Sequence, residues 1–331
     1  MLKQTLEKLC MRIDLSSKES KSALQAIFGG ANSYQTAAFL MLMRSKGETV
    51  EELFGMIEGM KELMVRVSVK NPLLDIVGTG GDGAHTLNIS TASAILAASC
   101  GVKVAKHGNR SVSSLCGSAD VLEALGIDII ASKESVARSI EELGIGFLFA
   151  PEYHPALKQL KELRKGLGTR TLFNLIAPFL NPASPEHFMI GVYREELLET
   201  AAELLARLNT RRSLVFHGNG LDELTCLGPV QAIEVSDGEL RPCTLDPEKF
   251  GLRRCCLEDL KGKDAVYNAQ KIREAFNGEE SPFAETIALN AGVAMHLYGK
   301  TSSIQEGIAE AKRHLQEKKA SELLNRWRDD V

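Results

Sequence analysis

Hydrophobic and polar residues follow two different patterns in the two parts of this chain. Through residues 1–65 apolar residues recur at helical spacing, as in LKQTLEKLCMRI and VEELFGMIEGMKELM, without the alternation typical of strands. From residue 72 onward, short apolar runs rich in β-branched residues alternate with longer amphipathic stretches, which is typical of strands joined by helices. We therefore expect a small all-helical domain and an α/β domain, whose central sheet is mostly parallel and flanked by helices.

The individual elements follow from the same pattern. Strands are expected at 73–77, 102–105, 127–130, 146–150 and 213–218, and helices at 90–100, 118–125, 133–143 and 155–166. Asp237 and Gly238 separate two alternating runs, which predicts a β-hairpin. Helices are expected to fill most of 257–331, whereas the proline-rich segment 171–188 is mixed and is expected to return to the helical domain.

Composition narrows the class of protein. The chain has 331 residues, of which 44% are hydrophobic and 25% charged, and this suffices for more than one packed domain. A net charge of −4 argues against nucleic acid or an anionic membrane as a partner. No apolar run approaches the ~18 residues of a membrane span, and the N-terminus lacks the apolar core of a signal peptide, so a cytoplasmic location is expected.

The glycine-rich stretch GTGGDG, residues 78–83, carries the first functional signal. It follows the strand predicted at 73–77 and leads to Asn88, Ser90 and Thr91, which are good caps for the apolar helix that follows. A helix start with free N–H groups is an anion site, so this layout favours phosphate binding. The stretch matches no P-loop and only formally a dinucleotide fingerprint, and a tight connection without a ligand is the alternative.

A second polar cluster follows the strand predicted at 102–105. Lys106, His107, Asn109 and Arg110 stand at its C-terminal end, ahead of a serine-rich run. Ligands of α/β sheets collect at such strand ends. A cation, an amide and several hydroxyl groups in one place favour a multiply phosphorylated ligand.

The segments GTGGDG, NIST and KHGNRSVSS resemble those of anthranilate phosphoribosyltransferases. These enzymes of tryptophan biosynthesis join anthranilate to phosphoribosyl pyrophosphate (PRPP). Further matches follow in the family's order, so the likeness spans nearly the whole chain: GSADVLEALG (117–126), GIGFLFAPEYHPALK (144–158), LGTRTLFN (167–174), NPA (181–183), HGNGLDEL (217–224) and TLDPEKFGL (244–252).

The resemblance implies how the chain is divided. Residues 1–67, with approximately 168–186, would form the helical domain, which commonly makes the homodimer contact in this family. Residues 72–165 and 187–331 would form the α/β domain that binds PRPP, with the active site in the cleft between the domains. Four apolar residues of the helical domain fit either its own core or the dimer surface: Phe39, Leu40, Leu42 and Met43.

The resemblance also implies the site residues. The PRPP site would contain Gly78, Gly81, Asp82, Thr86, Asn88, Ile89, Ser90, Thr91, Lys106, His107, Gly108, Asn109, Arg110, Ser111, Val112, Ser113, Ser114 and Ser118. Mg²⁺, as a pair of ions bound with PRPP, would be held by Ser90, Asp222 and Glu223, because carboxylates and pyrophosphate oxygens are its preferred ligands. Anthranilate would contact Gly78, Asn109 and Arg164, whose guanidinium suits the substrate carboxylate.

The expected reaction displaces pyrophosphate from C1 of the ribose, so the site must stabilise the leaving group and position the amine. An aniline-type nitrogen is already uncharged at neutral pH, and no residue is assigned as a catalytic acid or base. His107 is expected to shape the pocket, and His154 to be structural. The segment 177–179 reads Ala-Pro-Phe where the family more usually has Gly-Pro-Leu. This difference is expected to affect which substituted anthranilates are accepted.

Two other functions share some of these features. A pyrimidine nucleoside phosphorylase has a related phosphate motif, but the adjacent acids Asp222 and Glu223 and the KHGNR segment are not expected in it. A non-catalytic relative that binds nucleic acid would have a basic surface and eroded motifs. The expected partners are therefore the two small-molecule substrates and a second copy of the chain, without nucleic acid or membrane.

Overall fold

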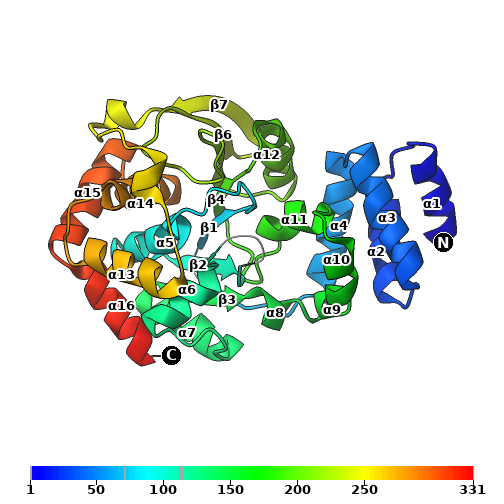
Figure 1. Ribbon diagram of the computed structural model, residues 1–331, viewed down its shortest axis with the longest axis horizontal. Coiled ribbons are helices and arrows are strands. Elements are labelled where there is room, and N and C mark those ends of the chain that lie inside the picture. Colours follow the sequence, from blue (N-terminus) through cyan, green and yellow to red (C-terminus); the bar gives the residue numbers. More distant parts are fainter. Residues whose placement is uncertain (1, 71, 112–114, 331) are drawn as a thin grey trace. The chain divides into compact units, whose positions relative to one another are not determined.

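The computed structural model describes residues 2–70, 72–111 and 115–330 of the chain (Figure 1). Its contacts divide the chain into two compact units. Residues 1–66 and 151–182 form the helical unit, and residues 67–150 and 183–331 form the α/β unit. The return segment of the helical unit thus begins at 151, whereas the sequence predicted a start near 168. The N–H of Val65 donates to the carbonyl of Tyr153 at 2.8 Å, which is one contact between the two parts of this unit.

The helical unit consists of short helices with well-defined starts. Its N-terminal part comprises α1 Leu2–Cys10, α2 Ser17–Phe28, α3 Ser33–Lys46 and α4 Val50–Leu63. Capping boxes open α2, with Ser16 and Glu19, and α4, with Thr49 and Glu52. The return segment comprises α8 Ala150–Tyr153, α9 Pro155–Lys158, α10 Lys161–Leu167, α11 Leu172–Ile176 and the 3-10 turn η1 Ala177–Phe179.

Two expectations for this unit are decided by burial. Phe39, Leu40 and Met43 of α3 are fully buried within the chain, so they belong to the core of the unit and not to a dimer surface. Leu42 is half-buried, and its burial fits either interpretation. The single helix predicted at 155–166 is wrong. The chain forms α9 and α10 instead, and Leu160 between them is buried.

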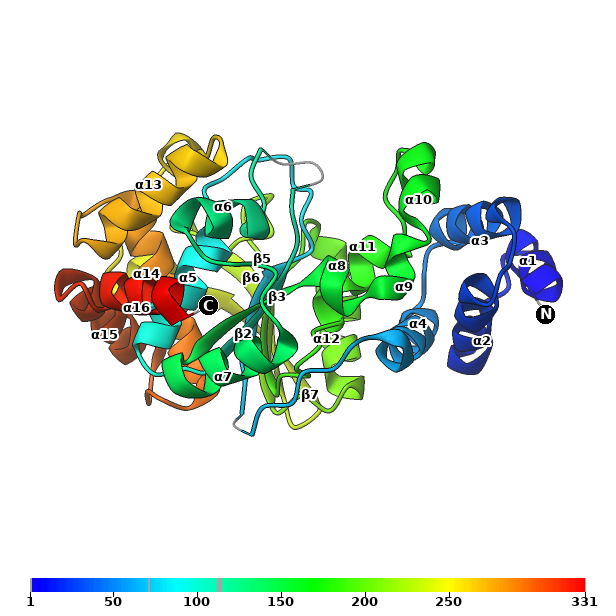
Figure 2. The same ribbon diagram turned by 90° about the horizontal axis from the view of Figure 1, so that it is seen from below.

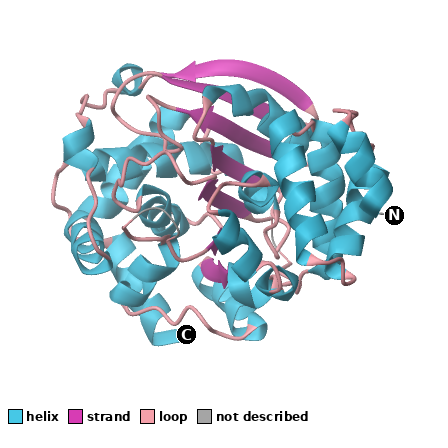
Figure 3. Ribbon diagram, turned by 45° about the vertical axis from the view of Figure 1, so that its right-hand side comes forward, coloured by secondary structure: helices cyan, strands magenta, loops and turns pink. Residues whose placement is uncertain are grey.

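The α/β unit is built on one seven-stranded sheet in the order β3-β2-β1-β4-β5-β6-β7 (Figure 3). The parallel strands are β1 Leu74–Gly78, β2 Val104–Gly108, β3 Ile145–Phe149, β4 His187–Gly191 and β5 Arg212–His217. The antiparallel β6 Val230–Ser236 and β7 Glu239–Leu245 complete it. Asp237 and Gly238 join these two with φ of 51° and 82°, so the predicted hairpin is confirmed.

Helices cover both faces of this sheet (Figure 2). They are α5 Ile89–Ser99, α6 Ser118–Leu125, α7 Lys133–Leu143, α12 Leu198–Arg207, α13 Ala265–Phe276, α14 Pro282–Tyr298, α15 Ile304–Gln316 and α16 Lys319–Asp330, with 3-10 turns η2 Glu195–Leu197, η3 Pro247–Phe250 and η4 Leu257–Leu260. The two most apolar helices, α5 and α14, pack against each other and are buried along most of their length. The predicted fold class is confirmed.

The structure corrects the predicted strands at three places. Residues 127–130 form a turn, because the Asp128 carboxylate accepts the N–H of Ile130 at 2.9 Å while Ile127 and Ile129 anchor the turn in the core. Strand β4 was missed, since its run of buried residues follows a proline-rich segment without alternation. Strand β2 continues to Gly108, past the predicted end at 105, so that Lys106 and His107 are strand residues.

Membrane insertion finds no support in the helices of the described chain, where none has both the length and the apolar character of a span.

Candidate active site

The order of the parallel strands reverses between β1 and β4. Strands β2 and β3 lie on one side of this point and β5 lies on the other. Ligands in open α/β sheets bind beyond the carboxyl ends of the strands at such a switch point. Here β1 and β4 end side by side, with Gly78 and Gly191 paired in register, and the glycine-rich stretch follows Gly78 directly.

Asp222 packs closely against both of these glycines. A Cβ atom on Gly78 would lie 2.3 Å from Oδ2 of Asp222, and one on Gly191 would lie 1.8 Å from its backbone oxygen. The N–H of Gly80 donates to the Asp222 carboxylate. The loop after β5 therefore reaches the ends of β1 and β4 because both positions lack a side chain.

Three carboxyl groups meet at this point. Asp222 is 7% exposed, and burial together with the neighbouring Asp82 raises its pKa to about 7. Burial and the Asp222 charge raise the pKa of Glu223, which the Lys106 ammonium and the N–H of Ser90 oppose. The repulsion between these acids would be relieved by a cation.

The acids fit a Mg²⁺ site that substrate and water complete, and they do not form a metal site made of protein ligands alone. Among the described residues, no three His, Cys, Asp or Glu side chains are arranged to hold a metal ion. Mg²⁺ usually binds proteins through one or two carboxylates and takes its remaining ligands from substrate phosphates and water. Asp222 and Glu223, next to a glycine-rich stretch, fit that pattern.

Strand β2 supplies buried polar groups. Lys106 is 3% exposed, and its ammonium donates to the carbonyl of Ile76 at 2.7 Å. Burial lowers the pKa of Lys106, while the charges of Asp75 and Glu223 act in the opposite direction. The N–H of His107 donates to the Asp75 carboxylate at 3.2 Å. The ammonium of Lys106 and the main-chain N–H of His107 are therefore both hydrogen-bonded to groups of β1, which suits their burial inside the sheet.

The loop after β2 is tied to the start of α6. The Asn109 carbonyl accepts the Ser118 hydroxyl at 3.1 Å, and the N–H groups of Ser111 and Gly117 donate to the Asp120 carboxylate. Arg110 pairs with Asp120 at 3.1 Å and with Glu123, and these acids raise its pKa. The predicted residues Val112, Ser113 and Ser114 lie outside the described residues.

At the start of α5, the predicted residues play different parts. Ile89 and Thr91 are buried, and the N–H of Ile89 donates to the Leu87 carbonyl at 2.7 Å. Asn88 occupies the cap position, but its side chain does not cap the helix as the sequence suggested. Gly81 and Asp82 lie in the loop before it, Thr86 forms an isolated β-bridge with Lys261, and Gly108 ends β2.

Comparisons with known proteins agree with this arrangement. Sequence models of the glycosyl transferase family match its helical bundle domain at residues 3–64 and its a/b domain at residues 70–321. The anthranilate phosphoribosyltransferase of Chlamydia caviae is 45% identical over 328 residues, which cover 99% of this chain and 96% of that protein.

Solved structures give the same answer. Anthranilate phosphoribosyltransferase from Thermus thermophilus is 42% identical, with a TM-score of 0.93 and coverage of 98% of both chains. The Saccharomyces cerevisiae enzyme, in complex with PRPP and Mg, is 27% identical, with a TM-score of 0.92 over 99% of this chain and 97% of that one. The chain belongs to the anthranilate phosphoribosyltransferase family.

Arg164, the family arginine expected for anthranilate, lies on α10 of the helical unit. It is half-buried, and its guanidinium lies over the ring of Phe173 with 5.6 Å to the ring centroid. Burial lowers its pKa, and no acid among the described residues offsets that shift. A half-buried guanidinium whose charge is not balanced by an acid is suited to a carboxylate ligand.

One part of this transferase site was missed in the sequence. Residues 260–268, far along the chain, hold residues 85–88, which follow the glycine-rich stretch and lead into α5. The N–H of Leu87 donates to the Leu260 carbonyl, and the N–H of Gly262 donates to the His85 carbonyl, both at 2.8 Å. Asn268 bonds to the side chain of Asn88. No local pattern distinguishes these residues from an ordinary helix start, so the sequence held no signal for them.

Proposed function

We propose that this chain transfers the phosphoribosyl group of PRPP to the amino group of anthranilate, with N-(5-phosphoribosyl)anthranilate and pyrophosphate as products, in tryptophan biosynthesis. Kinship to anthranilate phosphoribosyltransferases over 99% of the chain carries the proposal. It favours anthranilate over the nucleoside of a phosphorylase, and over a nucleic-acid ligand. The packing of Asp222 against Gly78 at the switch point supports it independently.

The glycine-rich stretch, the start of α5 and the loop after β2 bind PRPP in this proposal. Main-chain N–H groups near glycines can approach phosphate oxygens closely because no Cβ stands in the way. Arg110 is ion-paired with α6, so it binds PRPP only after giving up part of that pairing. We assign its main role to holding the loop.

Asp222 and Glu223 bind Mg²⁺ together with PRPP, and Ser90 lies beside them through its N–H bond to Glu223. Bound Mg²⁺ would neutralise charge on the departing pyrophosphate. The protein keeps Asp222 in place through the N–H of Gly80 and through close packing on Gly78, and the N–H of Ser90 holds Glu223. The number of ions, a pair by family resemblance, is part of the proposal.

Arg164 binds the carboxylate of anthranilate. Its planar guanidinium allows two parallel hydrogen bonds, which fix the orientation of the ring as well as its position. Gly78 and Asn109 are proposed as further anthranilate contacts in the α/β unit. The amine of anthranilate carries a lone pair at neutral pH, so the residues need only orient it, and no acid or base is assigned.

A homodimer through the helical unit is also proposed. Most of the exposed large apolar side chains of the described chain lie on this unit, including Met11, Tyr34 and Met41. This excess of exposed apolar side chains makes the helical unit the better candidate for an interaction surface. Light scattering on the wild type and on Tyr34→Glu tests this, and a monomeric wild type would contradict it. The cytoplasmic location stays a prediction.

The decisive experiment follows the fluorescence of anthranilate after addition of PRPP, with and without Mg²⁺. Loss of fluorescence that requires both PRPP and Mg²⁺ is expected. A folded protein that leaves the fluorescence unchanged would contradict the proposed reaction, and a phosphorolysis assay on pyrimidine nucleosides would come next.

A further inference from the structure

Two side-chain amides connect distant parts of the α/β unit in a directional chain. The N–H of Lys263 donates to Oδ1 of Asn268 at 2.8 Å. Nδ2 of Asn268 donates to Oδ1 of Asn88 at 2.9 Å, and Nδ2 of Asn88 donates to the Cys116 carbonyl at 3.2 Å. We call these bonds the amide relay. Asn268 is 1% exposed, so water does not replace a lost partner readily.

The two ends of the relay determine the orientation of both amides. Its first member is a backbone donor, at Lys263, and its last member is a backbone acceptor, at Cys116. An amide carries its donor and its acceptor on opposite arms. Turning either side chain by half a turn would therefore set two donors or two acceptors face to face. The relay holds Asn88 in one rotamer and one amide orientation.

Asn88 stands where the proposed PRPP contacts converge. It is the residue before α5, shortly after the glycine-rich stretch, and its bond to Cys116 reaches the loop that follows β2. The backbone bonds of Leu260 and Gly262 fasten the preceding residues, 85–87, to the same segment. A Cβ on Gly262 would lie 2.6 Å from the Thr86 carbonyl oxygen, so the backbone at Gly262 packs directly against the backbone at Thr86.

We propose that Asn268 is a positioning residue for PRPP, which acts by fixing the orientation of the Asn88 amide. This inference rests on the PRPP site proposed above. Asn268 itself does not touch the substrate in this account. Its loss removes one of the two bonds that orient the Asn88 amide and leaves only the bond to Cys116. PRPP must then order that side chain on binding, so the affinity for PRPP falls while the anthranilate contacts are unaffected.

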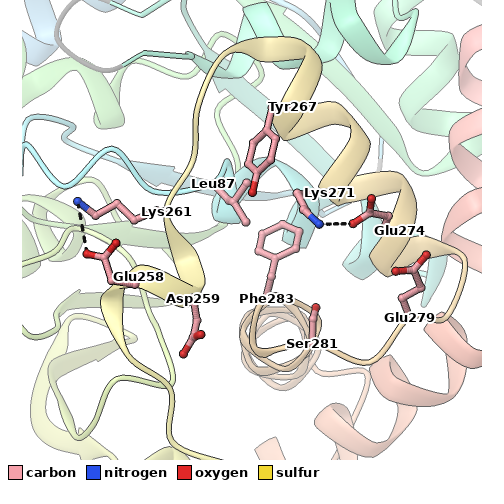
Figure 4. A pocket seen from close by; sticks show the side chains of 10 residues that line it. All are labelled: Leu87, Glu258, Asp259, Lys261, Tyr267, Lys271, Glu274, Glu279, Ser281 and Phe283. Atoms are coloured by element: carbon pink, nitrogen blue, oxygen red, sulfur yellow. Dashed lines mark hydrogen bonds and ion pairs between the residues drawn. The ribbon is translucent and has the colours of Figure 1, made fainter.

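The same helix supplies a control. Tyr267 and Lys271 of α13 point into a cavity of about 260 Å³, which Leu87 and Lys261 also line (Figure 4). Lys271 pairs with Glu274 at 2.6 Å and takes no part in the relay. Lys271→Ala is thus a substitution on α13, beside the relay, that leaves the relay intact.

The test compares Asn268→Ala with Asn268→Asp, by steady-state kinetics for both substrates and by calorimetric titration with PRPP and Mg²⁺. Asn268→Asp preserves the shape and the acceptor for Lys263, but it removes the donor to Asn88. Both variants should raise the KM and Kd for PRPP by about tenfold, the value of one hydrogen bond, with an unchanged KM for anthranilate. Lys271→Ala should match the wild type.

The near-isosteric variant separates orientation from packing. If Asn268 served only to fill space, Asn268→Asp would restore wild-type affinity for PRPP, and that result would overturn the proposal. Equal KM values for PRPP in wild type and both variants would overturn it as well. Should Asn268→Ala fail to fold, Asn268→Asp decides alone. An inactive wild type would instead contradict the proposed reaction, so the two failures are distinguishable.

Discussion

Helices α5 and α10 both carry residues proposed to bind a substrate, yet they are built in opposite ways. Nine of the eleven residues of α5 are buried, whereas α10 buries none of its seven. The start of α5 is held by the amide relay and by Glu223, while Arg164 of α10 contacts a single aromatic ring. The proposed phosphate site is therefore preorganised by the core, whereas the proposed anthranilate arginine lies on a loosely packed helix.

This contrast predicts which substitutions disturb folding and which disturb binding alone. Around α5 the charged groups are themselves buried, so a substitution that changes a charge there also changes the packing. Around α10, a side chain can be removed without opening a cavity. The following experiments test the contrast, beginning with the largest expected effect.

Replacing Asp222 and Glu223 together by Asn and Gln should lower kcat/KM by on the order of 10²–10³-fold and weaken its dependence on Mg²⁺. The melting temperature without Mg²⁺ should stay the same or rise, because the substitution removes repulsion between buried acids. Initial rates across a Mg²⁺ titration and a thermal melt measure both effects. Glu239→Gln, an exposed acid of β7, is the control, and a wild-type Mg²⁺ titration in the double variant would refute the metal role.

His154, at the start of α9, should make the protein sensitive to acid. It is 2% exposed, and burial lowers its pKa to about 4. The imidazole takes up a proton near pH 6.5 in the unfolded chain but only near pH 4 in the folded protein. The free energy of unfolding is therefore at its full value above pH 6.5, and it falls by up to roughly 3 kcal/mol as the pH drops toward about 4. Urea unfolding of wild type and His154→Gln across this range measures it. Identical pH dependence in both proteins would show that His154 does not contribute.

Arg164→Ala should raise the KM for anthranilate by about 10- to 100-fold, the value of a hydrogen-bonded charge, and leave the KM for PRPP unchanged. The melting temperature should not change, since α10 buries no residue. Arg164→Lys should not restore the affinity, because an ammonium cannot form the two parallel bonds. Lys165→Ala, the exposed neighbour, is the control. An unchanged KM for anthranilate would remove Arg164 from the pocket.

The smallest effect is expected from glycine. In α10 a Cβ on Gly166 would meet no atom within 4 Å, so Gly166→Ala should stabilise the helical unit by about 0.5–1 kcal/mol. Gly78→Ala, by contrast, would place its Cβ 2.3 Å from the Asp222 carboxylate and should destabilise the α/β unit. Urea denaturation measures both. Equal changes in the free energy of unfolding of the two variants would contradict the difference in packing between the two regions.

The sequence by itself determined the features that local chemistry encodes. Helical spacing in residues 1–65 and strand–helix alternation after residue 72 predicted the fold class, and Asp237-Gly238 predicted the hairpin between β6 and β7. The glycine-rich stretch indicated a phosphate site because glycine is required where main chain and ligand approach closely. Each of these signals lies within a few neighbouring residues.

Tertiary structure decided the rest. The short apolar run at 127–130, between two predicted helices, suggested a strand, but the Asp128 side chain closes a turn there. Strand β4 became recognisable only through its pairing with β1 and β5. Asn268 and Asn88 bond although they lie 180 positions apart, and the pKa of Asp222 depends on its burial beside Asp82. Periodicity records which face of an element is apolar, whereas the partners of a buried polar group depend on how the folded chain brings distant segments together.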